Sequence, residues 1–389
     1  MANTPRPHSA PSVTVLGSFP PQTQGISGYC GALATALADG TRVVALGFRA
    51  MYPPWLFPGV SEAMDETVAA PTAEQLTVQH TLAWYHPVGW LIAALQVRSD
   101  VLHIQWWSLA LTPVSIVFAL AARARGIPVV VTAHNVRPHE PSRLFRWASH
   151  LVYALAHHIV VHSDANLRQL QLDYGITAGR CSHVPMGISD TVGALPEREE
   201  ACQTLGLNSE RPMVLFFGII RPYKGVVYLL EALDIVRHTI PEVLLIVAGK
   251  PWGDAWEACE TVINERGLHD HVHCVLDYVP EATVADYFAA ARLVVLPYTH
   301  FDAQSAVGVQ ALGFGKTLIV TETGGLPELV DHDPRFCVPP EDPEALAQAI
   351  MTLLGTAEGR ADVELARDRT WEESARRHLE IYRRVAGTD

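Results

Sequence analysis

Residues 216–225 read Phe216-Phe217-Gly218-Ile219-Ile220-Arg221-Pro222-Tyr223-Lys224-Gly225, and this stretch decides the fold. It ends an apolar run that predicts a buried strand, and a helical pattern over Val226–His238 follows it directly. The turn between strand and helix is framed by glycine and proline and carries two cations, Arg221 and Lys224. Arginine offers a planar fork of donors and lysine a compact charge, so this pair suits a diphosphate better than it suits an ordinary surface turn.

Short apolar runs alternate with helical patterns on both sides of this turn. The expected strands are Val13–Leu16, Arg42–Leu46, Val101–Ile104, Pro128–Thr132, His158–His162, Met213–Phe217, Val243–Ala248, Val272–Leu276, Leu293–Leu296 and Thr317–Thr321. The expected helices include Gly28–Ala38, Leu167–Leu172, Val226–His238, Ala282–Ala290 and Pro343–Leu354. Continuous apolar strands bounded by amphipathic helices are typical of parallel sheets buried on both faces. Two such sets predict an α/β protein with two Rossmann-like, doubly wound domains.

The boundaries of these domains follow from turn signals. We expect a disordered lead over 1–12, the two domains over 13–195 and 196–370, and a closing helix over 371–389. The turn at Pro185-Met186-Gly187 and the polar run Pro196–Glu200 separate the domains. Apolar residues recur at helical spacing from Trp371 to Tyr382, which predicts that the last helix packs back on the body. Such sheets bind ligands outside the carboxyl ends of their strands, so we expect two domains facing a cleft.

Composition narrows the classes of partner. The formal net charge is −13, and nucleic-acid binding needs a surplus of lysine and arginine, so nucleic acid is excluded as a general partner. One group of arginines falls close together in the sequence and forms either a local basic patch or solvated helix faces. Its members are Arg123, Arg125, Arg143 and Arg146.

Cysteine spacing and hydropathy indicate where in the cell the protein is expected. The six cysteines are scattered without a Cys-x-x-Cys pair, so neither a zinc site nor a disulfide framework is indicated. The apolar stretches Leu109–Ala122 and Leu151–Val161 are shorter than the roughly 20 residues that a membrane-spanning helix needs. The first residues also lack the apolar core of a signal peptide. We therefore expect a cytoplasmic protein, either free or peripheral at the inner face of the membrane.

A glycine-containing turn, Pro20–Tyr29, follows the first expected strand. Gly25 in this turn would let backbone amides and a helix N-terminus approach an anionic group closely. The turn is not Gly-x-Gly-x-x-Gly, and no acidic residue follows the second strand, so a dinucleotide site is disfavoured. A plain strand-to-helix turn is the alternative.

A third segment, Asp302–Lys316, precedes the last expected strand, and Thr323–Glu328 follows that strand. The run Ser305–Phe314 is apolar and rich in small residues, which predicts a buried helix. The amides at its N-terminus suit phosphate or sugar oxygens. Gln310 on this helix either reaches a ribose or is satisfied by backbone groups. The pair Gly324-Gly325 is read equally well as a structural turn.

Polar side chains also end two strands of the first half. His134 follows Val131-Thr132-Ala133, and His139 and Glu140 come next on the same loop. Trp106 and Trp107 end the preceding strand and form either an aromatic platform for a sugar or a buried pair. At the carboxyl end of a strand, His134 is a candidate for function rather than for packing.

Together these segments resemble glycosyltransferase family 4, whose members have the GT-B fold. Pro222-Tyr223-Lys224-Gly225 and Gly324-Gly325-Leu326-Pro327-Glu328 carry the resemblance, which is strongest over Gly218–Val330 and extends over nearly the whole chain. It implies a hexose-type nucleoside diphosphate sugar held mainly by the C-terminal domain and an acceptor held mainly by the N-terminal one. It also implies transfer with retention at the anomeric carbon, without a bound metal or other cofactor.

The resemblance suggests roles for individual residues. In it, the cations stabilise the leaving diphosphate and the histidine orients the donor sugar. The catalytic candidates are His134, Asp302, Arg221 and Lys224. The donor-binding candidates are Gly25, Val279, Gln304, Ser305, Ala306, Val307 and Gln310. The acceptor candidates are Trp106, His139 and Glu140.

The sequence departs from the family at three places. Members usually carry two glutamates separated by seven residues, and here those positions hold Asp302 and Gln310. The arginine that usually follows the glycine is Ile219, and Arg221 is the available substitute. The common N-terminal Gly-Gly is Gln24-Gly25. A shorter acid and a neutral amide still accept hydrogen bonds from hydroxyls, so donor binding is still expected.

Two other functions stay open at this point. A nucleotide-sugar epimerase shares the two-domain fold, and a non-catalytic protein could bind a nucleotide sugar without turnover. The acceptor is a growing glycan, a glycolipid or a small metabolite, and resemblance to surface-polysaccharide transferases favours the first two. Aromatic residues on expected loops, Tyr52–Pro58 and Trp84–Trp90, line an acceptor groove, touch a membrane or pack together. The sequence leaves the oligomeric state open.

Overall fold

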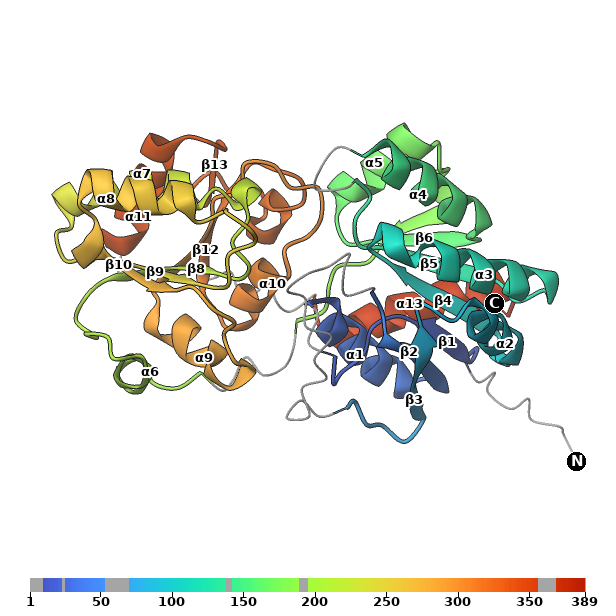
Figure 1. Cartoon of the computed structure of the whole chain (residues 1–389). Helices are drawn as coiled ribbons and strands as arrows, with labels where there is room; N and C mark the ends of the chain where they lie inside the picture. The colour runs from blue at the N-terminus through green and yellow to red at the C-terminus, as the bar shows by residue number, and fades with distance from the viewer. Residues whose placement is uncertain are drawn as a thin grey trace, which may run out of the picture. The chain divides into compact units, whose positions relative to one another are not determined.

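The computed structural model describes residues 10–22, 25–52, 70–137, 142–188, 195–355 and 369–388. Their contacts group the chain into two compact units. The first unit is the chain up to Gly187 together with the segment from Trp371 onward, and the second is Ile188–Thr370. Each unit is a parallel sheet between layers of helices (Figure 1).

The first unit has a seven-stranded sheet in the order β3-β2-β1-β4-β5-β6-β7. Its strands are β1 (Val13–Leu16), β2 (Val43–Ala50), β3 (Leu76–Ala83), β4 (Val101–Trp106), β5 (Val129–Ala133), β6 (His158–Val161) and β7 (Cys181–His183). Its helices are α1 (Gly25–Ala38), α2 (Pro87–Gln96), α3 (Thr112–Ala124), α4 (Arg143–Leu155), α5 (Asp164–Tyr174) and α13 (Trp371–Ala386). The chain runs outward from β1 to β3 and then returns beside β1, so the topological switch point lies between β1 and β4.

The second unit repeats this plan with a six-stranded sheet in the order β10-β9-β8-β11-β12-β13. Its strands are β8 (Met213–Phe217), β9 (Leu244–Ala248), β10 (Val272–Val275), β11 (Leu293–Leu296), β12 (Thr317–Thr321) and β13 (Cys337–Val338). Its helices are α6 (Arg198–Leu205), α7 (Val226–Thr239), α8 (Glu257–Arg266), α9 (Glu281–Ala290), α10 (Ala306–Gly313) and α11 (Pro343–Gly355). Here the switch point lies between β8 and β11.

The central strands explain why the sheets form. Every residue of β1, β4 and β5 is buried in the first unit, and every residue of β9, β11 and β12 is buried in the second. All strand pairs within these two sheets are parallel. Parallel strands covered on both faces need continuous apolar runs, and the sequence supplies them. The predicted doubly wound fold is confirmed. Among the described helices, none is long and apolar enough to cross a membrane.

The structure adds elements that the sequence did not predict. Strands β3, β7 and β13 all lie at sheet edges. Along the first part of β3 exposed residues alternate with partly buried ones, and β13 has two residues, so neither gives a continuous apolar run. Residues 87–90, expected on a loop, instead open helix α2, with Pro87 in its first turn where the missing amide costs nothing.

Helix α13 completes the first unit although it ends the chain. The hydroxyl of Tyr382 lies 2.7 Å from Nδ1 of His103 on β4. The ring of Trp371 packs edge-on against Tyr29 of α1, with centroids 5.3 Å apart. A Cβ at Gly187 would lie 2.4 Å from the Trp371 ring, so the chain can pass this ring only as glycine. The last helix therefore contributes to the interior of the first unit.

Candidate functional site

The loops that carry most of the candidate residues lie at the switch point of the second sheet. One loop follows β8 and includes a short 3-10 turn, Pro222–Lys224. The other follows the neighbouring strand β11 and ends at Ser305, which caps α10. Because both loops leave the carboxyl ends of adjacent parallel strands, they meet at the edge where open α/β sheets bind ligands.

Lys224 is a buried cation in this place. Its side chain is 9% exposed, and Nζ lies 5.5 Å and 5.9 Å from the ring centroids of Tyr298 and Phe216. Among the residues that the structure describes, no carboxylate forms an ion pair with it. Burial, together with the charge of Arg221, lowers the pKa of Lys224 to about 8. A desolvated ammonium beside aromatic faces is therefore available to an anion.

Two backbone segments approach this ammonium. A Cβ at Gly218 would lie 3.4 Å from Nζ of Lys224 and 3.3 Å from the Val307 side chain in the first turn of α10. Gly218 has φ of 101°, a conformation that favours glycine. The hydroxyl of Ser305 accepts a hydrogen bond from the Gly308 amide at 3.3 Å and so caps the helix. The β8 loop, the lysine and the positive end of the α10 dipole thus converge.

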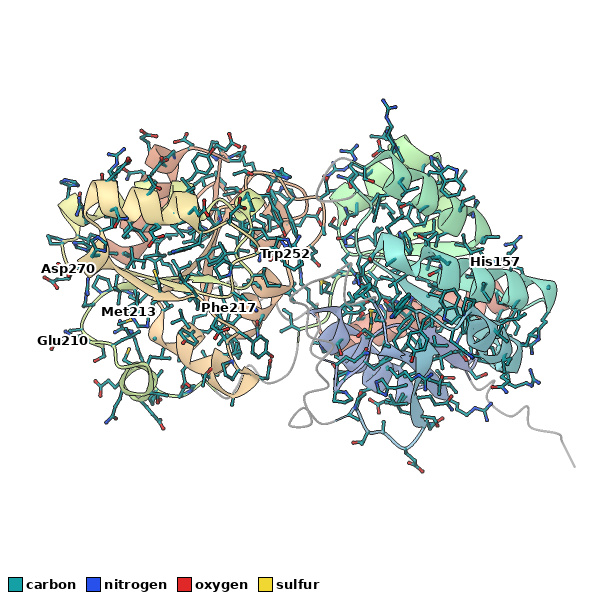
Figure 2. All side chains as sticks on the ribbon, viewed as in Figure 1. His157, Glu210, Met213, Phe217, Trp252 and Asp270 are labelled. Atoms are coloured by element: carbon teal, nitrogen blue, oxygen red, sulfur yellow. The ribbon has the colours of Figure 1, made fainter. Side chains whose placement is uncertain are left out.

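Arg221 lies against an aromatic ring that the sequence did not single out. This ring is Trp252, which is 40% exposed and is labelled in Figure 2. The guanidinium carbon of Arg221 lies 4.4 Å from its ring centroid. The Trp252 amide donates to the Ile220 carbonyl at 2.9 Å, which holds the two loops together. Stacking fixes the plane of the guanidinium and leaves its edge available for an anion. Ile219, at the family's usual arginine position, is 49% exposed.

The β8 and β11 loops are fastened to each other. The Thr299 amide donates to the Tyr223 carbonyl at 2.8 Å, and the Tyr223 ring stacks on Phe301 with centroids 6.1 Å apart. A Cβ at Gly324 would lie 1.8 Å from the Phe301 carbonyl oxygen. The loop after β12 therefore packs directly against the backbone that leads into Asp302. The loops after β8, β11 and β12 thus lie next to one another.

The remaining donor candidates are placed as follows. Gln304 and Ser305 are buried, and Asp302 and Gln310 are half-buried. Val279 is buried on the loop after β10, a strand that β9 separates from β8, so the topology does not bring it to the switch point. Gly25 begins α1 in the first unit.

The acceptor candidates are His139, Glu140 and Trp106. His139 and Glu140 lie outside the described residues, as do residues 53–58 of the first expected aromatic loop. Trp106 is fully buried in the core of the first unit, where its ring packs near Phe145. The prediction that Trp106 forms an aromatic platform for an acceptor is therefore wrong, because β4 turns this side chain into the interior. Trp107 is partly buried and donates to the Tyr52 hydroxyl at 3.0 Å.

His134 follows β5 in the first unit and is 8% exposed. Its Nε2 lies 2.8 Å from the amide oxygen of Gln105, and its Nδ1 lies 3.3 Å from Nε2 of His162. Burial lowers the pKa of His134 well below its usual range, and the neighbouring His162 and His103 add to the effect. Both ring nitrogens therefore have partners within the first unit, and the ring is neutral.

A single arrangement of protons satisfies these contacts. Nδ1 of His162 lies 2.9 Å from the Val184 carbonyl and must donate to it, so Nε2 of His162 is an acceptor. Nδ1 of His134 must then carry the proton that Nε2 of His162 accepts. It follows that Nε2 of His134 accepts from the NH₂ group of Gln105. This requires the Gln105 amide to be turned over, so that its NH₂ group and not its oxygen faces His134. With the Gln105 amide in this orientation, its oxygen takes the 3.2 Å contact with Nε2 of His103, which also lies 2.7 Å from the Thr132 hydroxyl.

In this arrangement Gln105 controls which nitrogen of His134 carries the proton. In Gln105→Glu, a carboxylate that only accepts would place the proton on Nε2 of His134 and stabilise the imidazolium, which raises the pKa of His134. We expect ¹³C-histidine NMR of the variant to show a His134 titration near neutral pH that the wild type lacks. Gln203→Glu makes the same change at an exposed position of α6 and serves as the control. An unchanged His134 signal in Gln105→Glu between pH 5 and pH 8 would contradict the assignment.

Sequence reasoning passed over Gln105 and Trp252. Gln105 had a detectable signal, because His103 and Gln105 are polar residues two apart on a fully buried strand and so share one face. Trp252 had none, because its contact with Arg221 joins loops after two different strands.

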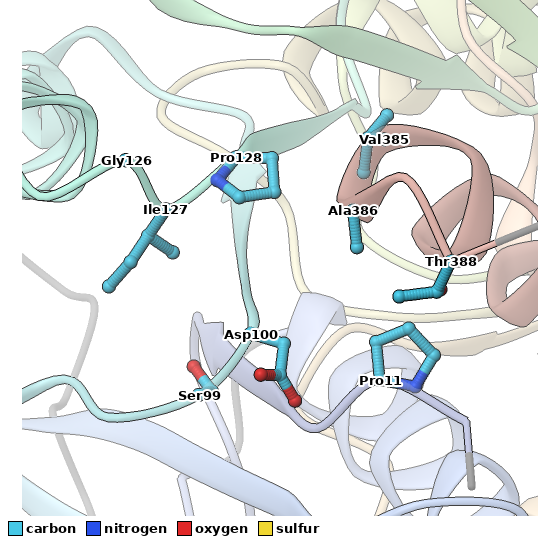
Figure 3. A pocket seen from close by; sticks show the side chains of 9 residues that line it. All are labelled: Pro11, Ser99, Asp100, Gly126, Ile127, Pro128, Val385, Ala386 and Thr388. Carbon is cyan, nitrogen blue, oxygen red and sulfur yellow. The ribbon is translucent and has the colours of Figure 1, made fainter. Parts of the chain in front are cut away.

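A separate pocket opens in the first unit (Figure 3). Pro11, Asp100 and Pro128 line it just before β1, β4 and β5 begin, and the end of α13 closes it. It therefore lies at the amino ends of the strands. Its carboxylate, Asp100, accepts hydrogen bonds from the Ser12 amide at 2.9 Å and the Ser12 hydroxyl at 2.6 Å. This pocket does not have the position or the free polar groups of a catalytic site.

Comparison with curated proteins finds several glycosyltransferases. D-inositol 3-phosphate glycosyltransferase of Kribbella flavida is 26% identical over 315 residues, which are 74% of this chain and 72% of that protein. The Segniliparus rotundus protein of the same name is 28% identical over 277 residues, or 66% of this chain and 61% of that protein. The putative teichuronic acid biosynthesis glycosyltransferase TuaC of Bacillus subtilis is 27% identical over 245 residues, or 60% and 56%. The chain thus spans less than two thirds of the Segniliparus protein.

Solved structures share the fold. A glycosyltransferase from Rickettsia africae superposes with a TM-score of 0.73 at 15% identity, covering 98% of this chain and 100% of that one. HepE of Anabaena, in complex with UDP-glucose, gives 0.65 at 18% identity, covering 97% and 99%. Two family models match the chain, Glycosyltransferase Family 4 over residues 25–192 and Glycosyl transferases group 1 over residues 211–356. With both units matched and the fold shared, the chain belongs to the family 4, group 1 glycosyltransferases of the GT-B type.

Proposed function

We propose that this chain is a retaining glycosyltransferase that moves a hexose-type sugar from a nucleoside diphosphate sugar to an acceptor hydroxyl. The observation that carries the proposal is the buried ammonium of Lys224, which has no carboxylate partner among the described residues and faces Gly218 and the first turn of α10. An isolated buried cation is costly unless an anion joins it. A diphosphate at this place offsets that cost.

The chemistry follows from where charge develops. When the bond between the anomeric carbon and the diphosphate breaks, negative charge grows on the leaving oxygen. Lys224, Arg221 and the amides that begin α10 are fixed before the reaction and stabilise that charge most strongly in the transition state. The acceptor hydroxyl attacks from the face that the diphosphate leaves, and the diphosphate takes the hydroxyl proton. In this scheme no resident cofactor is needed, because cationic side chains and helix amides supply the positive charge.

The departures from the family bear on the sugar. Asp302 replaces the usual first glutamate and Gln310 the second, and we assign them to hydroxyls of the donor sugar and of the ribose. Asp302 is one methylene shorter than glutamate, so the sugar it selects lies closer to the backbone between Phe301 and Gly324. His134 does not act as a general base in this scheme, because both its ring nitrogens already have partners within the first unit.

The acceptor is proposed from the relatives. Proteins similar to this chain bear names that point to an inositol phosphate and to teichuronic acid. Both are polyhydroxylated and anionic, so we propose a glycan, a glycolipid or a small hydroxylated metabolite as acceptor.

The first test is donor binding followed by product analysis. A nucleoside diphosphate sugar that binds the native state at about 100 times its Kd should stabilise it by about 2.7 kcal/mol. For the second unit, Ile188–Thr370, which has the size of a single domain, that is a rise in Tm of roughly 5–10 °C. Screening UDP-, GDP- and ADP-sugars by thermal shift identifies the donor, and NMR of the product of that donor then shows the anomeric configuration.

Three results would contradict the proposal. Inversion of the anomeric configuration would exclude retention. A new free nucleotide sugar formed without acceptor would indicate an epimerase. Donor binding without release of diphosphate to any acceptor, water included, would indicate a non-catalytic binder.

A further inference from the structure

Helix α2 leaves a continuous apolar stripe in solvent. Val88, Leu91, Ile92 and Leu95 are between 49% and 66% exposed, while Trp90 on the opposite side is buried. The four exposed residues recur at the spacing i, i+3, i+4 and i+7, which places them on one face of the helix. Exposed apolar residues scattered singly are ordinary, but a full stripe on one helix is not.

Exposed apolar residues also lie on the neighbouring helices. Helix α3 packs beside α2, and α4 packs beside α3 (Figure 1). Leu120 of α3 is 52% exposed, and Leu144 and Trp147 of α4 are 58% and 60% exposed. We call the exposed surface of these three helices the α2–α4 face. Its apolar members are Val88, Leu91, Ile92, Leu95, Leu120, Leu144 and Trp147.

The charged side chains within these three helices are all cationic, and Asp173 of the neighbouring α5 lies near one of them, Arg146. Helices α2, α3 and α4 contain no aspartate or glutamate, although the whole chain carries a formal net charge of −13. Arg98 and Arg125 both donate to the Leu95 carbonyl, and Arg123 donates to the Leu155 carbonyl, so these cations gather where the three helices end. Arg143 and Arg146 alternate with Leu144 and Trp147 in the first turns of α4.

We propose that the α2–α4 face is a docking surface for an anionic phospholipid bilayer. Leucine, isoleucine and tryptophan side chains enter the boundary between headgroups and acyl chains, and the arginines bind lipid phosphates around them. Arginine beside tryptophan at an interface suits this boundary, where one end of each side chain is apolar and the other is wet.

Charge argues against other occupants. Association of two copies through this face would bring five arginines against an identical set, and α2, α3 and α4 of either copy hold no carboxylate to pair with them. A nucleic acid would find the arginines but would leave the apolar stripe in water. An anionic bilayer offers phosphates to the arginines and an apolar interior to the stripe. The inference rests on the first unit alone and does not depend on the proposed donor site.

The test is flotation of the full chain with lipid vesicles. We expect binding to vesicles of phosphatidylcholine with one third phosphatidylglycerol, and much weaker binding to pure phosphatidylcholine. The double variant Arg143→Gln/Arg146→Gln should lower the partition coefficient about thirtyfold, since each arginine near an anionic surface contributes roughly a factor of five. Leu91→Gln/Ile92→Gln should lower it at least tenfold on both kinds of vesicle, because these residues insert rather than pair.

Matched variants on the second unit test whether the loss of charge or of an apolar side chain lowers binding wherever it is made. Arg266→Gln/Arg335→Gln removes the same charge from exposed positions, and Ile235→Gln removes an exposed aliphatic side chain from α7. These should bind like the wild type, and all variants should melt within a few degrees of it. Failure of the wild type to float with anionic vesicles at low salt would overturn the proposal. So would equal losses in the two sets of variants, or a change of oligomeric state in place of a change in vesicle binding.

Discussion

Lys224→Met should leave the protein folded and more stable than the wild type, yet lower turnover of the donor by about a hundredfold to a thousandfold. In the proposed mechanism the charge of Lys224 stabilises the leaving diphosphate, and removal of one preorganised donor of this kind has effects of that order. Loss of a charge-assisted contact should also weaken donor affinity about tenfold to a hundredfold. Isothermal titration with the donor and initial rates under saturating acceptor measure the two losses.

The sign of the stability effect follows from the pKa. Burial lowers the pKa of Lys224 from 10.5 to about 8, so between those values the unfolded chain holds a proton that the folded chain has released. Stability therefore rises with pH through this window, and at pH 7 the charged form costs about 3 kcal/mol. Methionine carries no such cost. The gain in Tm of Lys224→Met should be largest near pH 7 and should vanish as the pH approaches 10.5.

Lys316 provides a matched control. Burial lowers its pKa to about 8 as well, but it lies just before β12, at the amino ends of the strands. Its ammonium donates to the Ala291 carbonyl at 3.1 Å. Lys316→Met should leave donor affinity and turnover unchanged. If Lys224→Met turned over donor at the wild-type rate, or if both variants lost activity equally, the assignment of Lys224 to the diphosphate would be wrong.

Gly225→Ala should strongly destabilise the candidate site. Gly225 has φ of 66°, and a Cβ there would lie 1.9 Å from the Pro297 carbonyl oxygen. The backbone of either the β8 loop or the β11 loop must move to admit it, and both carry candidate residues. The left-handed conformation and the overpacking together should cost about 3–5 kcal/mol, and donor turnover should fall with the displacement of Lys224.

Substitution of Gly267 measures the cost of the left-handed backbone conformation without the cost of a steric clash. It has φ of 61° at the end of α8, and a Cβ there would meet nothing within 4 Å. Gly267→Ala should therefore cost only about 1 kcal/mol and leave turnover intact. Chemical denaturation of both variants measures the difference. Equal costs in the two variants would mean that the contact between Gly225 and Pro297 is not as close as described.

The sequence predicts the interior of both sheets well because burial on two faces leaves a clear pattern. Strands such as β9 and β11 are apolar at every position. Edge strands lack this pattern, and β3 and β13 were missed for that reason. Helix α2 was missed because Pro87 and Gly89 favour a loop in sequence, whereas packing of Trp90 and Ala94 against the core favours a helix.

The candidate site was predictable in part. The turn with Arg221 and Lys224 and the start of α10 could be placed, because glycine, proline and small residues mark them in sequence. Contacts between distant segments could not. Trp252 lies beside Arg221 because the sheet brings the loops after β8 and β9 together, and Gln105 of β4 reaches His134 because β5 is the neighbouring strand. Trp106 was misassigned because the sequence gives the strand but not the face to which its last residue turns.

The position of α13 constrains how the chain can fold during synthesis. The first unit needs this helix, yet the ribosome delivers it only after the roughly 180 residues of the second unit. At translation rates of about 5–20 residues per second, the surface that receives Tyr382 and Trp371 waits roughly 10–40 s for its partner. Ile188–Thr370 is contiguous and has no such delay. The N-terminal unit should therefore mature after the C-terminal one, and a nascent chain stalled before Trp371 should carry an open N-terminal core that chaperones recognise.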